Sequence, residues 1–370
     1  MSRLALAEFR CFPRLVLTAD DRPVVLVGAN GVGKTTILEA LSLLTPGAGL
    51  RGSRLADLGR REAPPGTTWA VNAHIRGAEG AVDIGTGRGD GDEARRVVRI
   101  DGRPARGPAA LGAVASALWL TPPMERLFGD GAGARRRFVD RLVFGFDAGH
   151  AKRVARYERT LRERARLLRE GRADAAWLRA LEARIAETGI AVAAARRATI
   201  RRLAAALADG VGPFPGGVLA LIGTVEDWLE TMPAVEAEGR FAEALAASRR
   251  RDAETGGAAV GPHRGDLDAR HGPLALPAAQ CSTGEQKALL IAILLAAARA
   301  QADQRGIVPL LLLDEVAAHL DESRRLALFD AITALGAQAW ITGSEAAVFA
   351  PLGDRARILA IAGGRAEPIT

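Results

Sequence analysis

Short apolar runs in the first hundred residues have the spacing of β-strands. Each run combines apolar and β-branched side chains over four to eight residues, and turn-forming residues separate the runs, including Pro13 and the glycine-rich segment 85–91. We expect these strands to form one antiparallel layer. The predicted strands are residues 4–9, 15–18, 69–76, 81–84 and 95–100.

A different pattern occupies residues 24–44. The run VVLV at 24–27 is typical of a buried strand, and Ile37, Leu38, Leu41 and Leu44 then recur at helical spacing. A strand is therefore expected to lead into a helix, and the segment that joins them is GANGVGKT, residues 28–35.

This segment has the residue types of a phosphate-binding loop. Glycine has no Cβ, so backbone N–H groups can close around phosphate oxygens, and the following helix N-terminus adds partial positive charge. Lys34 is expected to reach the β- and γ-phosphates, and the Thr35 hydroxyl to ligate Mg²⁺. The alternative is a glycine turn that happens to precede Lys-Thr. The predicted ATP-binding residues of the loop are Gly28, Ala29, Asn30, Gly31, Val32, Gly33, Lys34 and Thr35.

Helical periodicity begins near residue 118 and continues for roughly 130 residues rich in Ala and Arg. The glycine- and proline-rich segment 212–217 interrupts it, and neither a solenoid repeat nor a sustained heptad pattern is present. We expect an α/β fold with an inserted, mostly helical arm. The predicted parts are an N-terminal ATPase segment 1–117, a helical arm 118–250 and a C-terminal ATPase segment 251–370.

A second apolar run, residues 307–313, ends in two carboxylates. At the end of a core strand, Asp314 can hold the Mg²⁺ hydration shell together with Thr35, and Glu315 can orient and deprotonate the attacking water. Because successive side chains of a strand point in opposite directions, Asp314 and Glu315 could have separate roles. The alternative is that Asp-Glu simply opens a helix, whose N-terminal dipole favours acidic residues.

Two further segments carry polar groups at predicted helix starts. CSTGEQK, residues 281–287, precedes the apolar run 288–298, so Ser282 and Gly284 form another anion site at a helix N-terminus. AHLD, residues 318–321, follows the carboxylates. Asp321 is a nucleotide-site candidate, and the alternative is a plain N-cap for the helix that continues to about Leu335.

The charge distribution points to a polyanion partner. The chain has a net charge of +7, yet residues 135–205 contain 19 Lys or Arg against 8 Asp or Glu, so the remainder is net acidic. A merely solvated basic face is the alternative. With one Tyr and few other aromatic residues, phosphate contact is expected rather than base stacking. The DNA-binding candidates are Arg51, Arg54, Arg153, Arg156 and Arg159.

Composition excludes several other classes. The two cysteines define neither a disulfide framework nor a metal cluster, the apolar run 288–298 is too short to cross a bilayer, and no signal peptide is apparent. We therefore expect a cytoplasmic protein. Only three of the 50 basic residues are lysines, and one of these is Lys34.

The motifs together resemble ATP-binding-cassette ATPases, and within them the RecF family of the SMC-like branch. The resemblance covers nearly the whole chain, and the most family-specific segment is GPHRGDL, residues 261–267. Two departures stand out: Trp119 or Leu120 lies where a nucleotide-sensing Gln is common, and Thr342-Gly343-Ser344 stands where the last core strand often ends in histidine. The other segments that carry the resemblance are 9–12, 28–35, 120–122, 282–287 and 313–315.

The resemblance implies an ATP-dependent homodimer that clamps double-stranded DNA near single/double-strand junctions and hydrolyses ATP slowly, with Mg²⁺. It implies work with RecR and RecO in loading the recombinase, with nucleoid association. Arg10 is implied as a nucleotide contact. Ser282 and Gly284 are implied to bind the γ-phosphate of ATP held by the other subunit, although Cys281, Thr283 and Glu285 depart from the usual Leu, Gly and Gln.

Three other interpretations remain open. The nucleotide-binding subunit of a transporter would share the motifs but would pack them into a shorter chain without the basic helical segment. A small-molecule P-loop kinase would need a lid and an acceptor pocket, and would not need a Ser282-type site. A structural DNA clamp would bind ATP without hydrolysing it.

Overall fold

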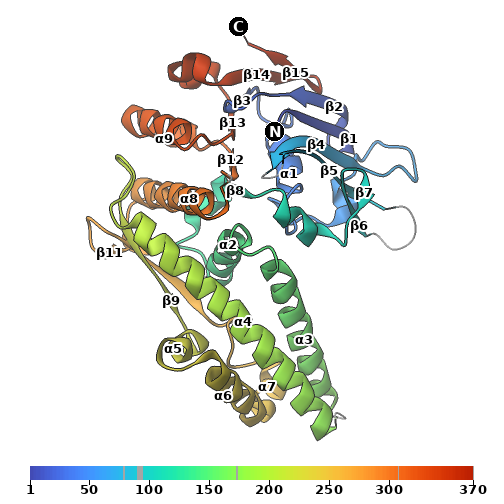
Figure 1. The fold of residues 1–370 in the computed structure, drawn as a ribbon, viewed down its shortest axis with the longest axis vertical. Helices are drawn as coiled ribbons and strands as arrows, with labels where there is room; N and C mark the ends of the chain where they lie inside the picture. The colour runs from blue at the N-terminus through green and yellow to red at the C-terminus, as the bar shows by residue number, and fades with distance from the viewer. Residues whose placement is uncertain (78–79, 90–94, 172–173, 307, 370) are drawn as a thin grey trace. The chain divides into compact units, whose positions relative to one another are not determined.

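The computed structural model describes residues 1–77, 80–89, 95–171, 174–306 and 308–369. Its contacts divide the chain into two compact units, drawn in Figure 1, which we call the head unit and the arm unit. The head unit comprises 1–125, 209–216 and 282–370, and the arm unit comprises 126–208 and 217–281. Of the predicted strand and turn residues, Asp90, Gly91 and Ile307 lie outside the described residues.

The unit boundaries differ from the expected breaks after residues 117 and 250. Strand β8 (Ala117–Leu120) pairs with β12 (Leu310–Leu313) and so belongs to the head unit. Strand β10 (Asp266–His271) pairs with β9 (Gly217–Ile222) and places 251–281 in the arm unit. Pairing between strands distant in sequence decides these boundaries, whereas the change of periodicity at residue 118 is a local signal.

A parallel sheet forms the centre of the head unit. Its strand order is β15-β14-β3-β13-β12-β8, and every neighbouring pair is parallel except β14 with β15. The phosphate-loop strand β3 thus lies between two strands from the C-terminal part of the chain. The strands not yet given bounds are β3 (Val24–Val27), β13 (Ala339–Gly343), β14 (Arg357–Ala362) and β15 (Arg365–Pro368).

The predicted antiparallel layer is also present, in the order β2-β1-β4-β5-β6-β7. Two details differ from the expectation. Pro13 lies within β2, and residues 85–88 continue β5 rather than form a turn. Gly87 pairs there with Ala70 of β4, and a Cβ on Gly87 would sit 2.7 Å from the carbonyl oxygen of the preceding Trp69. The strands are β1 (Arg3–Phe9), β2 (Phe12–Thr18), β4 (Ala70–Gly77), β5 (Gly80–Arg88), β6 (Arg96–Ile100) and β7 (Arg103–Pro104).

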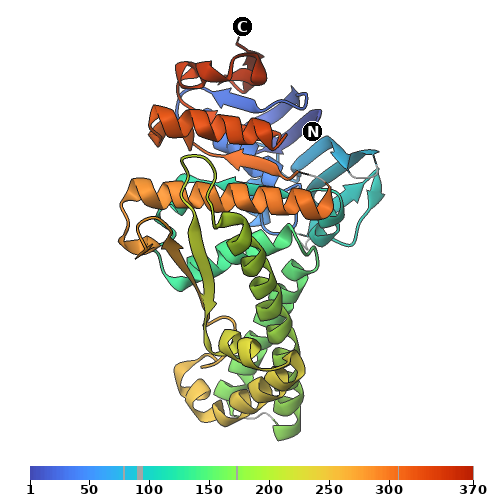
Figure 2. The same cartoon turned by 60° about the vertical axis from the view of Figure 1, so that its left-hand side comes forward.

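Helices cover both faces of the parallel sheet. Helix α1 (Lys34–Ser42) lies on one side, and α8 (Thr283–Arg305) and α9 (Glu322–Ala334) run next to each other on the other side (Figure 2). One apolar core joins Leu6 and Val71 of the antiparallel layer to Leu41 of α1 and Trp340 of β13. The core therefore fixes α1, and with it the phosphate loop, between the two sheets.

The arm unit is mostly helical, as expected, with a three-stranded sheet ordered β11-β10-β9. Helices α3 and α4 run side by side (Figure 1) and share a core with α6 that includes Tyr157, Ile185 and Phe241. The arm helices are α2 (Ala132–Phe144), α3 (His150–Glu170), α4 (Ala175–Leu207), α5 (Thr224–Thr231), α6 (Ala234–Ala247) and α7 (Arg249–Thr255), and the short strand is β11 (Leu276–Pro277).

Short 3₁₀ turns link the larger elements. Within the described residues, no helix combines the length and the apolar character that a membrane span needs. The 3₁₀ turns are Leu55–Leu58, Pro108–Ala113, Pro122–Arg126, Ala278–Gln280, Ala317–His319 and Ala346–Arg355.

Candidate nucleotide-binding site

The predicted phosphate loop connects β3 to α1 through glycines whose backbone only glycine adopts readily. Gly28 and Gly33 have φ values of +153° and +105°. A Cβ on Gly33 would lie 2.6 Å from the Phe12 ring, and one on Gly28 would lie 2.5 Å from the Ile361 carbonyl oxygen. At Gly31, with φ +87°, a Cβ would meet nothing within 4 Å. The loop is therefore packed on its flanks and open at its centre, as a phosphate cradle requires.

Lys34 begins α1 and its side chain is buried under this loop. Its Nζ donates hydrogen bonds to the carbonyl oxygens of Gly28 (2.6 Å) and Ala29 (3.1 Å) and lies 3.5 Å from Glu315 Oε1. The ammonium group is thus held against the loop backbone, where it can reach the β- and γ-phosphates of a bound nucleotide.

Thr35 and Asp314 meet although 279 residues separate them. The Thr35 hydroxyl lies 2.9 Å from Asp314 Oδ1 and 3.1 Å from Oδ2. A hydroxyl and a carboxylate at this separation supply the hard oxygen ligands that Mg²⁺ prefers, directly or through its water shell. The donor set therefore fits the predicted metal site. Within the described residues, no cluster of three or more His, Cys, Asp or Glu side chains could hold a metal by itself.

Asp314 and Glu315 are oriented differently from the expectation. Strand β12 ends at Leu313, so neither carboxylate lies on the strand, and Glu315 has a left-handed backbone with φ +54°. A left-handed non-glycine residue costs about 1–2 kcal/mol. This bend, rather than strand alternation, separates the two side chains and brings Glu315 to Lys34.

Thr342, at the end of β13, is a site residue that the sequence analysis missed. Its hydroxyl donates to Asp314 Oδ1 at 2.8 Å and accepts from the Glu315 N–H at 2.9 Å. From the sequence, segment 342–344 is notable only for the absence of a histidine. Thr342 is identified by its position in the sheet rather than by a sequence motif. Strands β13 and β12 are adjacent and parallel, so their carboxyl ends meet at one edge of the sheet.

The other departure, at Trp119 and Leu120, lies in β8. Both side chains are buried, and the Leu120 carbonyl oxygen accepts from the Asp314 N–H at 2.9 Å. Strand β8 thus pairs with β12, the strand that precedes Asp314, at the edge of the parallel sheet.

The segment 281–287 begins helix α8 as predicted. Ser282 is the N-cap, and its hydroxyl accepts from the Glu285 N–H at 3.3 Å, while Gly284 lies in the first turn. Lys287 is buried and lies 2.7 Å from Glu125. No phosphate contact of Ser282 or Gly284 is tested by this geometry, and their role stays a prediction.

Asp321 is the N-cap of α9, where its carboxylate accepts from the Arg324 N–H at 2.8 Å. The N-cap role of Asp321 is therefore confirmed. A cap leaves carboxylate lone pairs available, so the nucleotide role of Asp321 stays a prediction.

Arg10 lies at the tight β1–β2 turn, with φ +53°, and binds Glu39 of α1 through two hydrogen bonds of 3.0 and 2.7 Å. It also donates to Ser53 and to the Asp57 carbonyl oxygen. Arg51 reaches the same Glu39 carboxylate at 3.1 Å. Glu39 is almost fully buried and was missed because nothing in its local sequence marks it. The nucleotide contact of Arg10 and the DNA contact of Arg51 stay predictions.

The candidate DNA-binding arginines of the arm unit differ in whether they already form an ion pair. Arg153 is paired with Asp147, whereas Arg156 and Arg159 are exposed on α3, as is Arg54 in the head unit. Part of the positive charge counted in 135–205 is internal. Arg164, for example, is buried between Glu182 and Asp252, at 3.0 and 2.8 Å. The net charge of the segment therefore overstates its surface charge.

The family-specific segment 261–267 lies in the arm unit, and it is held there by buried polar contacts. His263 Nδ1 is 2.7 Å from the Tyr157 hydroxyl, Arg196 donates to the Pro262 carbonyl oxygen at 2.7 Å, and Arg135 pairs with Asp266 at 2.7 Å. Burial lowers the pKa of His263. These contacts assign the segment a structural role in joining α2, α3 and α4 to β10.

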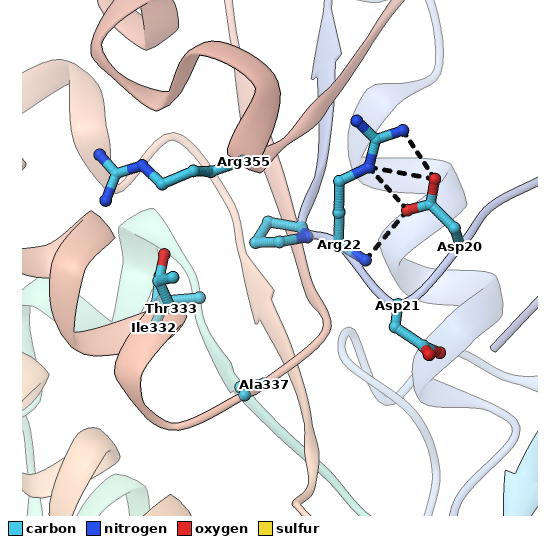
Figure 3. Close-up of a pocket in the computed structure, with 9 residues that line it drawn as sticks. Asp20, Asp21, Arg22, Ile332, Thr333, Ala337 and Arg355 are labelled. Carbon is cyan, nitrogen blue, oxygen red and sulfur yellow. Dashed lines mark hydrogen bonds and ion pairs between the residues drawn. The ribbon is translucent and has the colours of Figure 1, made fainter.

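A cavity of about 500 Å³ lies elsewhere in the head unit (Figure 3). Arg22 and Pro23 line it just before β3, and Ala337 lines it just before β13. It therefore lies at the amino ends of these strands, whereas the phosphate loop follows the carboxyl end of β3. It is not the nucleotide site.

Comparison with known proteins identifies relatives along the whole chain. The family model described as the RecF/RecN/SMC N terminal domain matches residues 1–360. The protein named DNA replication and repair protein RecF from Mesorhizobium japonicum is 46% identical, covering 100% of this chain and 97% of the relative. Its namesake from Rhizobium meliloti is also 46% identical, covering 99% and 98%. These relatives favour DNA repair over the transporter subunit and the small-molecule kinase.

Solved structures confirm the fold. The structure described as the recombination mediator protein RecF-ATPrS in the RecFOR pathway superposes with a TM-score of 0.86 at 20% identity, covering 100% of this chain and 98% of that one. A second, described as RecF-ATP, gives 0.83 with the same identity and coverage. An Smc head bound to the C-winged helix domain of ScpA gives 0.57 at 16% identity, covering 100% and 96%.

Proposed function

The chain belongs to the RecF family of SMC-like ATPases, and from this premise we propose that it is an ATP-dependent DNA-binding protein of gap repair and replication restart. The single observation that carries the proposal is the meeting of Thr35 with Asp314 at 2.9 Å, beside Lys34 and Glu315. The predicted phosphate loop, the predicted Mg²⁺ ligands and the carboxylate proposed to activate water lie together at this point.

Each residue has a proposed role in hydrolysis. Lys34 holds the β- and γ-phosphates, and Thr35 and Asp314 hold Mg²⁺, which neutralises phosphate charge when bound. Glu315 orients the attacking water and accepts its proton. Thr342 keeps both carboxylates in place through its two hydrogen bonds.

The proposed working form is a homodimer with two shared ATP sites. Ser282 and Gly284 of one subunit face the γ-phosphate held by its partner, so that an isologous pair completes both sites at once. The dimer clamps duplex DNA near single/double-strand junctions and helps to load the recombinase, with RecR and RecO as partners and the cytoplasmic nucleoid as its location. The structural relative described in the RecFOR pathway supports RecR and RecO as the partners.

Turnover of ATP with and without duplex DNA tests the proposal. We expect slow hydrolysis that duplex DNA accelerates, whereas Glu315→Gln should bind ATP, fail to turn it over and remain dimeric longer. A matched control is Glu322→Gln, which changes another acidic residue of the head unit in the first turn of α9. Binding of ATP and DNA with no hydrolysis would instead identify the structural clamp, and normal turnover in Glu315→Gln would move the base elsewhere.

A further inference from the structure

Arg324 connects the two helix starts that are proposed to meet a partner's nucleotide. Its guanidinium lies 2.8 Å from Glu285 Oε1 in the first turn of α8, and its Nε lies 3.8 Å from Asp321, the N-cap of α9. The same guanidinium lies 3.9 Å from where a Cβ on Gly284 would be. The Arg324 guanidinium therefore lies beside the turn that contains Ser282 and Gly284.

Glu285 creates an electrostatic problem at this turn. A carboxylate in the first turn stabilises its own helix, because it complements the positive end of the dipole. For an incoming phosphate the effect is opposite, since a negative charge in the first turn cancels the partial positive charge that attracts the anion. The Glu285 side chain is 29% exposed, so solvent screens this repulsion only in part.

Arg324 is suited to cancel that charge. Its side chain is 24% exposed, and its backbone is fixed by the Asp321 cap, so the guanidinium is presented to Glu285 from a rigid helix start. Since charge-assisted hydrogen bonds are short and directional, the 2.8 Å contact also draws the carboxylate toward α9.

We infer that Arg324 is a positioning residue for the shared ATP site: by neutralising Glu285, it lets the start of α8 accept the γ-phosphate of ATP held by the partner subunit. The inference rests on the proposed trans arrangement. It concerns dimer formation rather than ATP binding by one chain, because Lys34 and Thr35 bind the nucleotide within the subunit.

A rescue experiment tests this role. In Arg324→Gln we expect ATP-dependent dimerisation to weaken about tenfold or more, because each of the two sites then loses the guanidinium that lies against the Glu285 carboxylate. Adding Glu285→Gln should restore dimerisation, since the charge that Arg324 neutralises is gone. Dimerisation is measured by analytical ultracentrifugation with ATP in the Glu315→Gln background, which blocks hydrolysis. The control is Arg355→Gln, which breaks a more exposed ion pair of the head unit, with Asp330 at 2.8 Å.

Two further measurements separate this role from simple stabilisation. Binding of a fluorescent ATP analogue by the monomer and the nucleotide-free melting temperature should stay unchanged in Arg324→Gln. A merely structural ion pair predicts the reverse: the melting temperature falls, and the double variant stays as defective as the single one, because the pair is still absent. A lower melting temperature without rescue by the double variant, or unchanged dimerisation in Arg324→Gln, overturns the role of Arg324 and leaves the proposed dimer intact. Failure of the Glu315→Gln parent to dimerise with ATP overturns the proposed dimer as well.

Discussion

Thr342 shows how one hydroxyl can organise a hydrolytic site. It is fully buried at the end of β13, donates to Asp314 and accepts from the backbone of Glu315. The left-handed backbone of Glu315 is costly in isolation, and the hydrogen bond to its N–H helps to maintain it. The positions of the proposed metal ligand and the proposed base therefore depend in part on the buried Thr342.

Thr342→Val keeps the shape of the side chain and removes both hydrogen bonds. We expect turnover to fall about tenfold while ATP affinity holds, and the free energy of unfolding to fall by about 1–2 kcal/mol, because the Glu315 N–H is left unpaired. Single-turnover hydrolysis and urea denaturation measure the two effects. Thr333→Val, which removes an exposed hydroxyl bonded to the Phe329 carbonyl oxygen, is the control. Unchanged turnover in Thr342→Val would show that Glu315 keeps its position without this hydroxyl.

At the residue scale, local motifs were predictable and long-range partners were not. The strand–loop–helix context of Lys34 and Thr35 was predictable because a phosphate loop is contiguous and its pattern is contained in eight neighbouring residues. Their roles toward a nucleotide stay predictions. Glu39 and Thr342 depend on the distant chain segments that pack against them. No pattern around either residue encodes those partners.

At the scale of elements, helix α3 illustrates how a net charge can mislead. Arg153 is held by Asp147 near the start of the helix, while Arg156 and Arg159 are exposed one and two turns later. Only the latter two are available for a phosphate backbone without first breaking an ion pair.

The double reversal Arg156→Glu/Arg159→Glu should weaken duplex binding to a similar extent for all sequences. It should also reduce the slope of log affinity against log salt by about two, one per lost phosphate contact. Fluorescence anisotropy over a salt series measures both quantities. Arg250→Glu, on the highly exposed surface of α7, is the control. If affinity and slope do not change, the exposed face of α3 is only solvated, and Arg51 and Arg54 become the next candidates.

Another element-scale feature is the buried carboxyl group of Glu226 at the start of α5. Its Oε2 has no hydrogen-bond partner among the described residues, and Gly223 and Gly265 pack against it so closely that a Cβ on either would lie within 3 Å of a carboxylate oxygen. Burial raises its pKa and Asp227 adds to this, while Arg196 and Arg136 act in the opposite direction. The folded arm unit therefore favours the neutral form of Glu226 more than the unfolded chain does.

The sign of the pH effect follows from this shift. Because the pKa is higher in the folded state, the contribution of Glu226 to stability is full below the ordinary glutamate pKa and is lost as the pH rises through the folded value. Glu226→Gln stays neutral and should melt roughly 2–4 °C higher than the wild type near pH 8, with a smaller difference near pH 5. Thermal melts across this range, with exposed Glu236→Gln as the control, measure the effect. An equal difference at both pH values would contradict it.

At the scale of the whole molecule, the fold class and the mostly helical insertion were predictable, because periodicity reports elements directly. The boundaries were not. The β9–β10 pairing joins two strands that are separated along the chain by the three helices α5, α6 and α7. Such pairing is decided by tertiary packing, which a single sequence does not display.

The trans arrangement makes a whole-molecule prediction. Lys34→Ala lacks a phosphate ligand, and Ser282→Arg places a bulky side chain where the γ-phosphate of the partner would bind, so each variant alone should be inactive. In a mixed dimer, the intact loop of one chain faces the intact Ser282 of the other, and one complete site is restored. We expect partial recovery of DNA-dependent ATPase on mixing. Mixed dimers that crosslinking detects with ATP, yet that do not turn over, would count against the shared site.

The strand order of the head unit also has a consequence for biosynthesis. Strand β3, made near the start of translation, pairs only with β13 and β14, which follow it by over 300 residues. At roughly 5–20 residues per second, the ribosome needs about 15–60 s to deliver them. Until then the apolar strand before the phosphate loop has two unpaired edges. The arm unit ends at residue 281 and is therefore synthesised before β13 and β14. We expect the nascent chain to fold the arm first and to expose the edges of β3 to aggregation in that interval.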